Sequence, residues 1–410
     1  MSKLPLEGIR ICDLSYFWSG PYCTAYLGGM GAEVIKVESI QRPDTFRFGN
    51  VVSDLWWEKN AQWNCTNINK YGLTLDLNHP RGIELFKELV KVSDVVIENF
   101  PPRVMENFNL TYPVLRKLKP DLIMVSVPGY GLTGPWRDYV GFGLAFEQVS
   151  GLAYLTGYTD RPPQLLTGAS DPIVGMHVAF AILAALQYHR RTGRGQLIDI
   201  SQAEVLTTFM GPAVADYSMN KRVWQRNSNR DPIMAPHGVY RCKGEDMWIA
   251  IAVSSEHEWW AFCQAIGKPE LAQHESFSTL INRCRNQDSL DILIEEWTLE
   301  HDRYEAMDIL QKAGVAAGAV IAIDQLHNEP QFKARELYRR MTRDIIGTQI
   351  YPRWPIVFSD VSPTMRPAPT LGQHNDYVLA AILGLSKAEM EELKKDQVIG
   401  NSPLGAGRAL

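Results

Sequence analysis

Asp171 is the residue of this sequence whose type and position best suit covalent chemistry. It stands with Pro172 at the start of a long apolar stretch, and we expect a helix over Asp171–Arg191 with Asp171 as its N-cap. A structural cap is the usual role of Asp-Pro at a helix start. A carboxylate at the positive end of a helix also stays ionised, and an ionised carboxylate is a competent nucleophile toward an activated acyl group. The residues alone leave both roles open.

A few other residues are candidates for ligand contacts. Asn99 ends an expected strand, and open α/β sheets bind ligands at the carboxyl ends of their strands. Glu147 and Gln148 follow a glycine-rich turn, where contact with a substrate and capping of the next segment are equally good interpretations. His177 lies within the expected apolar helix, and a core histidine is its better interpretation.

The sequence contains no recognisable dinucleotide, phosphate or metal motif. The first expected turn reads SYFWSGP, with one glycine where G-x-G-x-x-G is needed, so an NAD-dependent oxidoreductase is a weak alternative. The segment GASDP is not a nucleophile elbow. The nine histidines are scattered and the six cysteines form no C-x-x-C pair. We therefore expect no metal site, and buried free thiols in a reducing compartment.

Composition excludes several classes of partner. The 410 residues include 41 basic and 46 acidic side chains, a net charge of −5, and this balance argues against nucleic acid or an anionic membrane as partner. No apolar run reaches the length of about 18–20 residues that a membrane span needs. The N-terminus lacks the apolar region of a signal peptide, so we expect a cytoplasmic protein.

Strands and helices alternate through the first half of the chain, which predicts a mostly parallel sheet covered by helices. Strands are expected at Ile9–Leu14, Ala32–Glu38, Leu73–Leu77, Asp94–Glu98, Leu122–Val127 and Gln196–Ser201. Helices are expected at Tyr22–Met30, Pro80–Val92 and Pro113–Leu118. Pro128–Ala169 is rich in glycine and proline, and so long an irregular stretch is usually functional. The helix over Asp171–Arg191 is apolar on nearly all sides and is expected to be buried.

Seven segments, taken in order, resemble the family III CoA-transferases, which include formyl-CoA, carnitine and bile-acid CoA-transferases. They extend from residue 5 to about residue 400 and read PLEGIRICDLSYFWSGPYCTAYLGGMGAEVIKVE, NKYGLTLDLNHPRG, DVVIENFPP, LKPDLIMVSVPGYGLTGPW, SDPIVGMHVAFAILAALQYHRRTGRGQLIDIS, PHGVYRCKGEDMWIAIAV and PTLGQHNDYVLAAILGLS.

The resemblance implies a fold. It is an α/β fold with an open, Rossmann-like parallel sheet in a large domain built from both chain ends, plus a smaller α+β domain. We place the large CoA-binding domain at 1–206 with 335–410 and the small domain at 237–325, joined by linkers at 207–236 and 326–334. Two ring-like subunits would interlock as a homodimer, with a paralogous partner subunit as the alternative.

The resemblance also implies a mechanism. Asp171 matches the family's catalytic aspartate, which attacks the donor thioester to form an anhydride and then an aspartyl-CoA thioester, from which the acceptor carboxylate takes CoA. This route uses a CoA thioester as substrate and needs no permanently bound cofactor and no metal.

The CoA contacts of the family carry over to nine positions: Phe17, Trp18, Ser19, Leu75, Asn78, Asn99, Val104, Asn107 and Phe108. The sequence departs from formyl-CoA transferase at Ser39, Asn78 and Asn107, where that enzyme has basic residues. The cations that hold the CoA phosphates are therefore left open.

Two departures concern the acceptor. Gly143 replaces an acid common in the family, and the chain reads VSSEHEWW where formyl-CoA transferase has a glycine-rich flap. We expect Phe142, Gly143 and Glu147 to line a substrate pocket. The acceptor would be larger than oxalate, such as an aromatic or branched dicarboxylate, with succinyl-CoA as donor.

Two alternatives share the fold. The related α-methylacyl-CoA racemases pair the matching aspartate with a histidine in a G-H-D segment. That segment is Gly141-Phe142-Gly143 here, so the histidine and its neighbouring acid are both missing. The second alternative is a non-catalytic subunit of a heteromeric transferase.

Overall fold

Six parallel strands form a central sheet in the computed structural model, which describes residues 3–49, 53–166 and 168–404. The strand order is β3-β2-β1-β4-β5-β6. Their bounds are β1 Arg10–Asp13, β2 Glu33–Glu38, β3 Lys70–Thr74, β4 Val95–Glu98, β5 Ile123–Ser126 and β6 Leu197–Asp199. The order reverses between β1 and β4, and the carboxyl ends of strands at such a switch point form the usual ligand site of open α/β sheets. The predicted α/β fold with a parallel sheet is confirmed.

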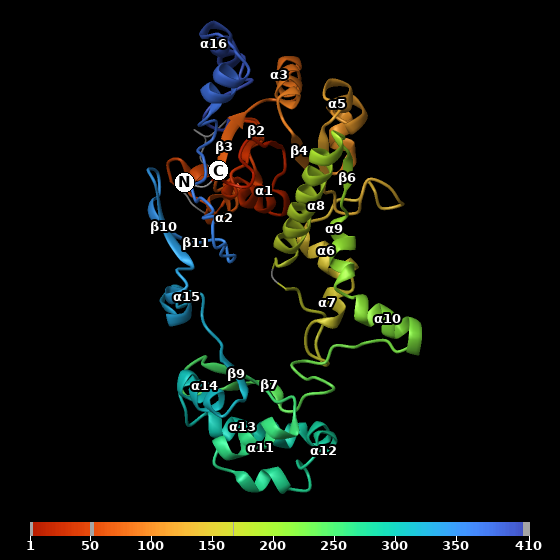
Figure 1. The fold of residues 1–410 in the computed structure, drawn as a ribbon, viewed down its shortest axis with the longest axis vertical. Helices are drawn as coiled ribbons and strands as arrows, with labels where there is room; N and C mark the ends of the chain where they lie inside the picture. The colour runs from red at the N-terminus through yellow and green to blue at the C-terminus, as the bar shows by residue number, and fades with distance from the viewer. Residues whose placement is uncertain (1–2, 50–52, 167, 405–410) are drawn as a thin grey trace. The chain divides into compact units, whose positions relative to one another are not determined.

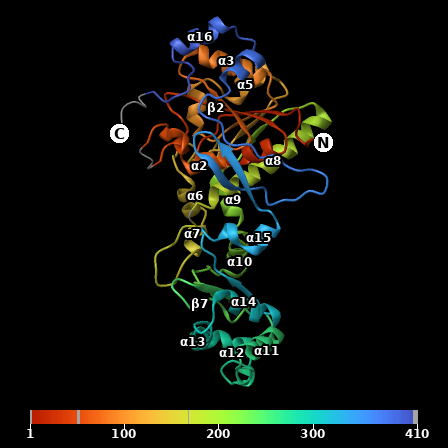
Figure 2. The ribbon, with the colours of Figure 1, turned by 90° about the vertical axis from the view of Figure 1, so that its left-hand side faces the viewer.

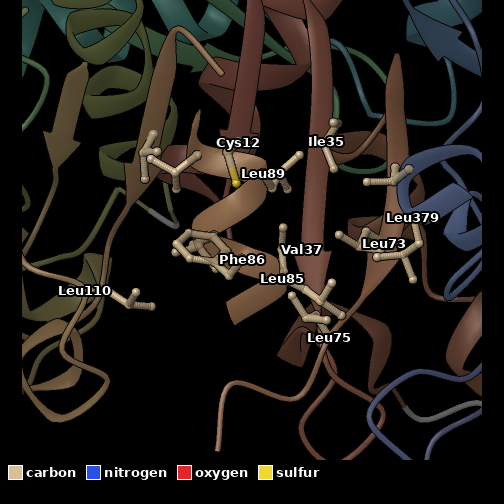
Figure 3. Packing of buried hydrophobic residues seen from close by; sticks show 14 of the residues in the cluster. Cys12, Ile35, Val37, Leu73, Leu75, Leu85, Phe86, Leu89, Leu110 and Leu379 are labelled. Atoms are coloured by element: carbon tan, nitrogen blue, oxygen red, sulfur yellow. The ribbon is translucent and has the colours of Figure 1, made fainter. Parts of the chain in front are cut away.

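Successive residues of each strand pack on opposite faces of the sheet, because side chains alternate along a strand. Cys12 is paired with Ile35 and with Val96, and all three join one core cluster. Their neighbours Ile11 and Val34 join the other. Figure 3 shows the first cluster, in which side chains of β1, β2 and β3 meet those of a covering helix.

Different helices cover the two faces. The first cluster packs beneath α3 (Pro80–Lys91), α4 (Pro102–Asn107), α5 (Tyr112–Leu118) and α16 (Lys387–Lys395). The second packs beneath α1 (Ser19–Gly29) and α8 (Ser170–Thr192). Gly175 lets α1 and α8 approach closely, because a Cβ there would lie 2.6 Å from the Ser19 carbonyl oxygen.

Residues near the C-terminus complete this sheet unit. Gly72 of β3 exchanges hydrogen bonds with His374, donating to Nδ1 at 3.0 Å and accepting from the His374 amide at 2.9 Å. Figures 1 and 2 show α16, in blue, beside α3, and Glu389 forms an ion pair with Arg81 at 3.7 Å. The same part of the chain contains a π-helix, Tyr377–Ile382, and the hairpin of β10 (Tyr338–Arg343) and β11 (Gly347–Pro352).

The described residues divide into two compact units. The unit with the large sheet draws on 1–153, 165–222 and 334–410, and the second on 154–164 and 223–333. The segment 154–164 was predicted in the large domain but belongs to the second unit. Tyr154 explains this, since its hydroxyl donates to Gln225 at 2.9 Å and its carbonyl accepts from Arg226 at 3.0 Å.

The second unit is built on an antiparallel sheet of β7 (His237–Arg241), β8 (Trp248–Ala252) and β9 (Ala316–Ala319). Its helices are α11 (Glu256–Ala265), α12 (Leu280–Arg285), α13 (Gln287–Thr298) and α14 (Arg303–Lys312). The VSSEHEWW segment leads from β8 into α11: Ser255 caps the helix, and Trp259 is buried in the core of this unit.

Several expected irregular regions contain helices. The stretch 128–169 includes α6 (Gly143–Val149) and α7 (Leu152–Leu155), and the linker predicted over 207–236 begins with the end of α9 (Gln202–Thr208) and contains α10 (Gly211–Asn220). The linker predicted over 326–334 contains η4 (Leu326–Asn328) and α15 (Pro330–Ala334). Short 3-10 turns and the small helix α2 complete the described elements: η1 Thr45–Arg47, η2 Trp56–Glu58, α2 Ala61–Thr66 and η3 Pro269–Gln273.

The expectation that α8 is buried on nearly all sides is wrong. Val174, Val178 and Ile182 are buried, but Phe180 is 74% exposed. Among the described helices, α8 is the single one with the length and apolar composition of a membrane span. The core helix of a soluble protein passes the same test, so this is weak evidence for a membrane. The six cysteines are free; Cys65 is exposed and Cys284 partly buried, contrary to the expected burial.

Candidate functional site

Asp171 lies in the first turn of α8. The structure corrects its predicted role as N-cap, because the helix begins one residue earlier, at Ser170, with Ala169 as the cap. Ala169 already has helical backbone angles (φ −68°, ψ −21°), so the Asp-Pro pair falls inside the first turn. A carboxylate there still faces the positive end of the helix dipole.

Gly143 makes room for this carboxylate. A Cβ at that position would lie 2.5 Å from Asp171 Oδ2 and 2.7 Å from Ser170 Oγ. The start of α6 therefore approaches the start of α8 as closely as a residue without a side chain allows. The structure places Gly143 against Asp171. That Gly143 lines a substrate pocket remains a prediction.

Glu147 presents a second carboxyl group to the same site. It follows Gly143 by one helical turn of α6, so the two residues share a face. The Glu147 side chain is fully buried; Oε2 accepts a hydrogen bond from the Leu166 amide at 2.9 Å. Its Oε1 and the buried Ser170 Oγ have no partner among the described residues. Unpaired buried polar atoms beside a carboxylate are typical of a site that awaits a polar ligand.

The electrostatic environment of Asp171 favours reactivity near neutral pH. Burial, and next the negative charge of Glu147, raise the pKa of Asp171 to about 6. A carboxylate with a raised pKa is more basic than an ordinary one and still ionised at pH 7.

Aromatic side chains of the first βα turn contact the segments that lead into α6 and α8. Phe17, with the positive φ of 64°, packs edge-on against Phe142 at 5.2 Å between ring centroids and against Phe46 at 5.8 Å. Trp18 lies beside Phe46 at 6.0 Å, and a Cβ on Gly168 would lie 3.1 Å from its ring. These contacts bring the first turn, the start of α6 and the loop before α8 together.

Asn99 holds that turn in place. Its Oδ1 accepts from the Tyr16 amide at 2.8 Å, and its Nδ2 donates to the Tyr16 carbonyl at 2.8 Å and to Ser19 Oγ at 3.4 Å. The side-chain amide is thus engaged by the protein, so the structure indicates a positioning role for a residue that we expected to contact CoA.

A buried charge network beneath the turn was not anticipated. Lys36 forms an ion pair with Asp44 at 3.1 Å and donates to the Ser15 carbonyl, while Asp44 accepts from the Phe17 amide at 3.2 Å. Four positive and four negative side chains balance in this region: Lys36, Lys70, Arg47, Arg343, Asp13, Asp44, Glu38 and Glu58. The sequence IKVE, in which charged and apolar residues alternate, could have indicated this network, because charges on a central strand must be paired.

A cavity of about 450 Å³ opens at the carboxyl ends of β1, β2, β3 and β4. Its volume lies in the usual range for small-molecule sites. Of the predicted CoA contacts, four line it: Leu75, Asn78, Val104 and Phe108. Asn107 is exposed and is not among the lining residues. Tyr16 lines the cavity, while Phe17 contacts Phe142 at the start of α6, so the first turn connects the two regions.

Within the ranges that the structure describes, no three His, Cys, Asp or Glu side chains are grouped as a metal site would require.

Comparison with known proteins shows similarity to one enzyme family. The model of CoA-transferase family III matches residues 6–375. The chain is 33% identical over 408 residues to succinyl-CoA–D-citramalate CoA-transferase from Chloroflexus aurantiacus, covering 96% of this chain and 98% of that one. It is also 33% identical over 401 residues to the alpha subunit of succinyl-CoA–L-malate CoA-transferase from Chloroflexus aurantiacus, covering 97% and 93%.

A solved structure shares the fold over almost the whole chain. The CAIB/BAIF family protein from Brucella suis superposes with a TM-score of 0.85 at 30% identity, covering 93% of this chain and all of that one. With the match to the family model, this makes the chain an enzyme of the CoA-transferase class. The protein belongs to CoA-transferase family III.

Proposed function

We propose that this enzyme transfers CoA from succinyl-CoA to a carboxylic acid larger than oxalate, with Asp171 as the nucleophile. The observation that carries the proposal is the position of the Asp171 carboxylate. It lies in the first turn of α8, against Gly143 and beside unpaired buried oxygens of Glu147 and Ser170. The donor is inferred from the two relatives above, both of which are named for succinyl-CoA.

The first half of the reaction moves CoA onto the protein. A carboxylate oxygen of Asp171 attacks the thioester carbonyl carbon, and the carbon–sulfur bond breaks to release CoA thiolate and leave a mixed anhydride. The thiolate then attacks Cγ of Asp171. The donor acid leaves as its carboxylate, and an aspartyl-CoA thioester remains.

The second half repeats these steps in the opposite direction. The acceptor carboxylate attacks Cγ of the thioester and expels the thiolate, which then attacks the acceptor's carbonyl carbon. The new acyl-CoA forms and the Asp171 carboxylate is regenerated. No net proton or electron is consumed, so the chemistry requires only a positioned carboxylate and a polarising environment.

Three features suit these steps. The amides at the start of α8 favour negative charge on Asp171. The absence of a side chain at Gly143 leaves room for the Asp171 carboxylate itself against the start of α6. Phe17 packs on Phe142, the neighbour of Gly143, and so adds apolar surface beside the start of α6.

The acceptor is inferred from the missing charge at position 143 and from the relatives. A neutral glycine at position 143 avoids repelling an anionic acceptor, and the relatives are named for the hydroxylated dicarboxylates citramalate and malate. We therefore favour a branched or substituted dicarboxylate over an aromatic one.

The proposed assembly is a cytoplasmic homodimer. A partner subunit encoded as a paralogue is the second candidate, because one relative is the alpha subunit of a two-component enzyme.

Intact mass spectrometry tests the proposal. The protein is mixed with succinyl-CoA beside Asp171→Ala and a control, Asp138→Ala, which removes an exposed carboxylate. We expect a hydroxylamine-sensitive adduct of the mass of CoA on the native chain and the control, and none on Asp171→Ala. No adduct on the native chain despite CoA binding would point to the non-catalytic alternative, and exchange of the α-proton of a 2-methylacyl-CoA in D₂O would point to a racemase.

A further inference from the structure

The cavity beside the first turn contains a cation that the proposed mechanism does not use. Arg42 is the single positively charged residue among the described residues that line this cavity. It is exposed, and its guanidinium has no ion-pair or hydrogen-bond partner within the described ranges. Ser39 and Asn78, which also line the cavity, are neutral.

The backbone of Arg42 is fixed although its side chain is free. The Arg42 amide donates to Ser39 Oγ at 3.0 Å, and its carbonyl accepts from the Tyr16 hydroxyl at 2.9 Å. The segment that carries the guanidinium thus follows β2 directly and is hydrogen-bonded to the first βα turn through Tyr16. A free guanidinium on a fixed turn suits phosphate recognition, because its N–H groups match phosphate oxygens in pairs.

Gln41 supplies a second, independent sign of a ligand. Its Nε2 donates to the Gln397 carbonyl at 2.8 Å, whereas its Oε1 is buried without a partner among the described residues. Gln41 also lines the cavity. Leaving a buried acceptor unpaired costs free energy, so the geometry points to a hydrogen-bond donor on the ligand, such as an amino group or a hydroxyl.

The remaining walls suit a nucleoside. Leu75, Phe100, Val104 and Phe108 provide apolar surface for a base. Two carboxylates line the cavity as well. Glu38 is neutralised by Arg47, which donates to both its oxygens at 2.8 and 2.9 Å. Asp76 accepts from the Asn78 amide at 2.9 Å through Oδ1, which leaves Oδ2 for a hydroxyl of the ligand.

We propose that Arg42 binds a phosphate group of the nucleotide end of the CoA thioester in this cavity, with Gln41 Oε1 accepting a hydrogen bond from the same nucleotide. The proposal rests on the proposed function, which makes a CoA thioester the substrate. Arg42 then takes the place of the missing basic residues at 39 and 78, and it determines affinity for CoA without taking part in the chemistry at Asp171.

Steady-state kinetics with truncated donors tests this role. Succinyl-CoA, its 3′-dephospho form and succinyl-pantetheine, which lacks the whole nucleotide, are compared in the native enzyme, Arg42→Gln and Arg42→Lys. Arg241→Gln serves as the control, since Arg241 is an exposed arginine of the second unit.

We expect Arg42→Gln to raise KM for succinyl-CoA about tenfold with kcat within about twofold, as for loss of one charge-assisted hydrogen bond. Succinyl-pantetheine should react equally well with both proteins, and Arg42→Lys should restore most of the affinity. If the loss disappears with the 3′-dephospho donor, the 3′-phosphate is the group bound; if it persists, the diphosphate is.

A KM within twofold of the native value, or an equal loss with succinyl-pantetheine, would overturn the role of Arg42. Calorimetric titration of CoA into native protein and Arg42→Gln gives the same comparison without turnover. Failure of the proposed transfer therefore remains distinguishable from failure of this phosphate site.

Discussion

At the scale of single residues, Asp171 and Glu147 place two carboxyl groups in one site, and burial together with the Glu147 charge determines the pH at which Asp171 is able to attack. Burial and the charge of Glu147 raise the pKa of Asp171 to about 6. The nucleophile must be ionised, and its ionised fraction falls about tenfold for each pH unit below the pKa. We expect the rate of adduct formation to decline below pH 6 and to reach about a tenth of its plateau at pH 5.

Replacing Glu147 by Gln should move this acid limb to lower pH. The amide keeps an oxygen for the Leu166 amide but removes the negative charge, so the pKa of Asp171 falls and the carboxylate stays ionised in more acidic solution. Stopped-flow or quenched mass spectrometry from about pH 4.5 to about pH 8, on both sides of the Asp171 pKa, measures the shift. Glu245→Gln, at an exposed turn, is the matched control. An acid limb at the same pH in both variants would remove Glu147 from this role.

Gly143 offers a second test at the same scale. Alanine at this position would put a methyl group 2.5 Å from Asp171 Oδ2, and the carboxylate would have to turn away. We expect Gly143→Ala to lower kcat on the order of 100-fold, the effect typical of displacing a reacting group by about 1 Å. Thermal unfolding measures any loss of stability separately, because the added methyl group would also lie 2.7 Å from Oγ of the buried Ser170.

Gly211→Ala is the control for that experiment, because a Cβ there meets nothing within 4 Å. Equal kcat values in Gly143→Ala and Gly211→Ala would show that the closeness of α6 to Asp171 does not matter for catalysis.

At the scale of elements, the first βα turn depends on one side chain from a neighbouring strand end. Asn99 pairs with both the amide and the carbonyl of Tyr16. Replacing it by Ala leaves these buried backbone groups unpaired, at a cost of about 1–3 kcal/mol for each unsatisfied group. We expect the urea midpoint of Asn99→Ala to fall with an unchanged m value, together with a higher KM for the CoA donor because the turn borders the cavity.

Asn220→Ala is a matched control, since that amide donates to Asp216 on the surface at 2.8 Å. If the two variants unfold at the same urea concentration and bind CoA alike, the turn does not depend on Asn99.

Elements with a clear hydrophobic period were predictable, and those shaped by tertiary contact were not. Strand β2 and helix α3 lie within a residue or two of the expected bounds, because their apolar residues repeat with periods of two and 3.6. Strand β3 lies at Lys70–Thr74 and not at Leu73–Leu77, since pairing with β2 sets its register. The short helices α6 and α7 carry too few periodic residues to be seen within a glycine-rich stretch.

The site, like the fold, was predictable only in part. Asp171 stood out because Asp-Pro opens a long apolar helix. The juxtaposition of Gly143, Glu147 and Asp171 joins residues from two helices, and no local pattern encodes it. Arg42 was missed because an exposed arginine in a turn has no sequence signature; only the cavity around it gives it a role.

At the scale of the whole molecule, exposed apolar side chains indicate an interface. Met176, Phe180 and Leu183 form a stripe along α8 at helical spacing, with exposed fractions of 39%, 74% and 45%. Helix α10 also exposes two apolar side chains, Val214 and Met219. A stripe of exposed apolar side chains along one helix is typical of a protein–protein contact.

The proposed homodimer can be tested on this patch. A second copy covering α8 would bury Phe180, and an acidic side chain there would carry an unpaired charge into an apolar contact. We expect analytical ultracentrifugation to show twice the chain mass for the native protein and a protein-concentration-dependent shift toward the single chain for Phe180→Glu. Ile323→Glu is the control, because Ile323 is 88% exposed and lies in the second unit. A dimer that survives Phe180→Glu as well as Ile323→Glu would place the contact elsewhere.

A native chain that remains single, and that gains activity only with a paralogous subunit, would favour the two-component assembly. The distinction bears on catalysis, because the exposed side chains lie on the helix whose first turn contains Asp171.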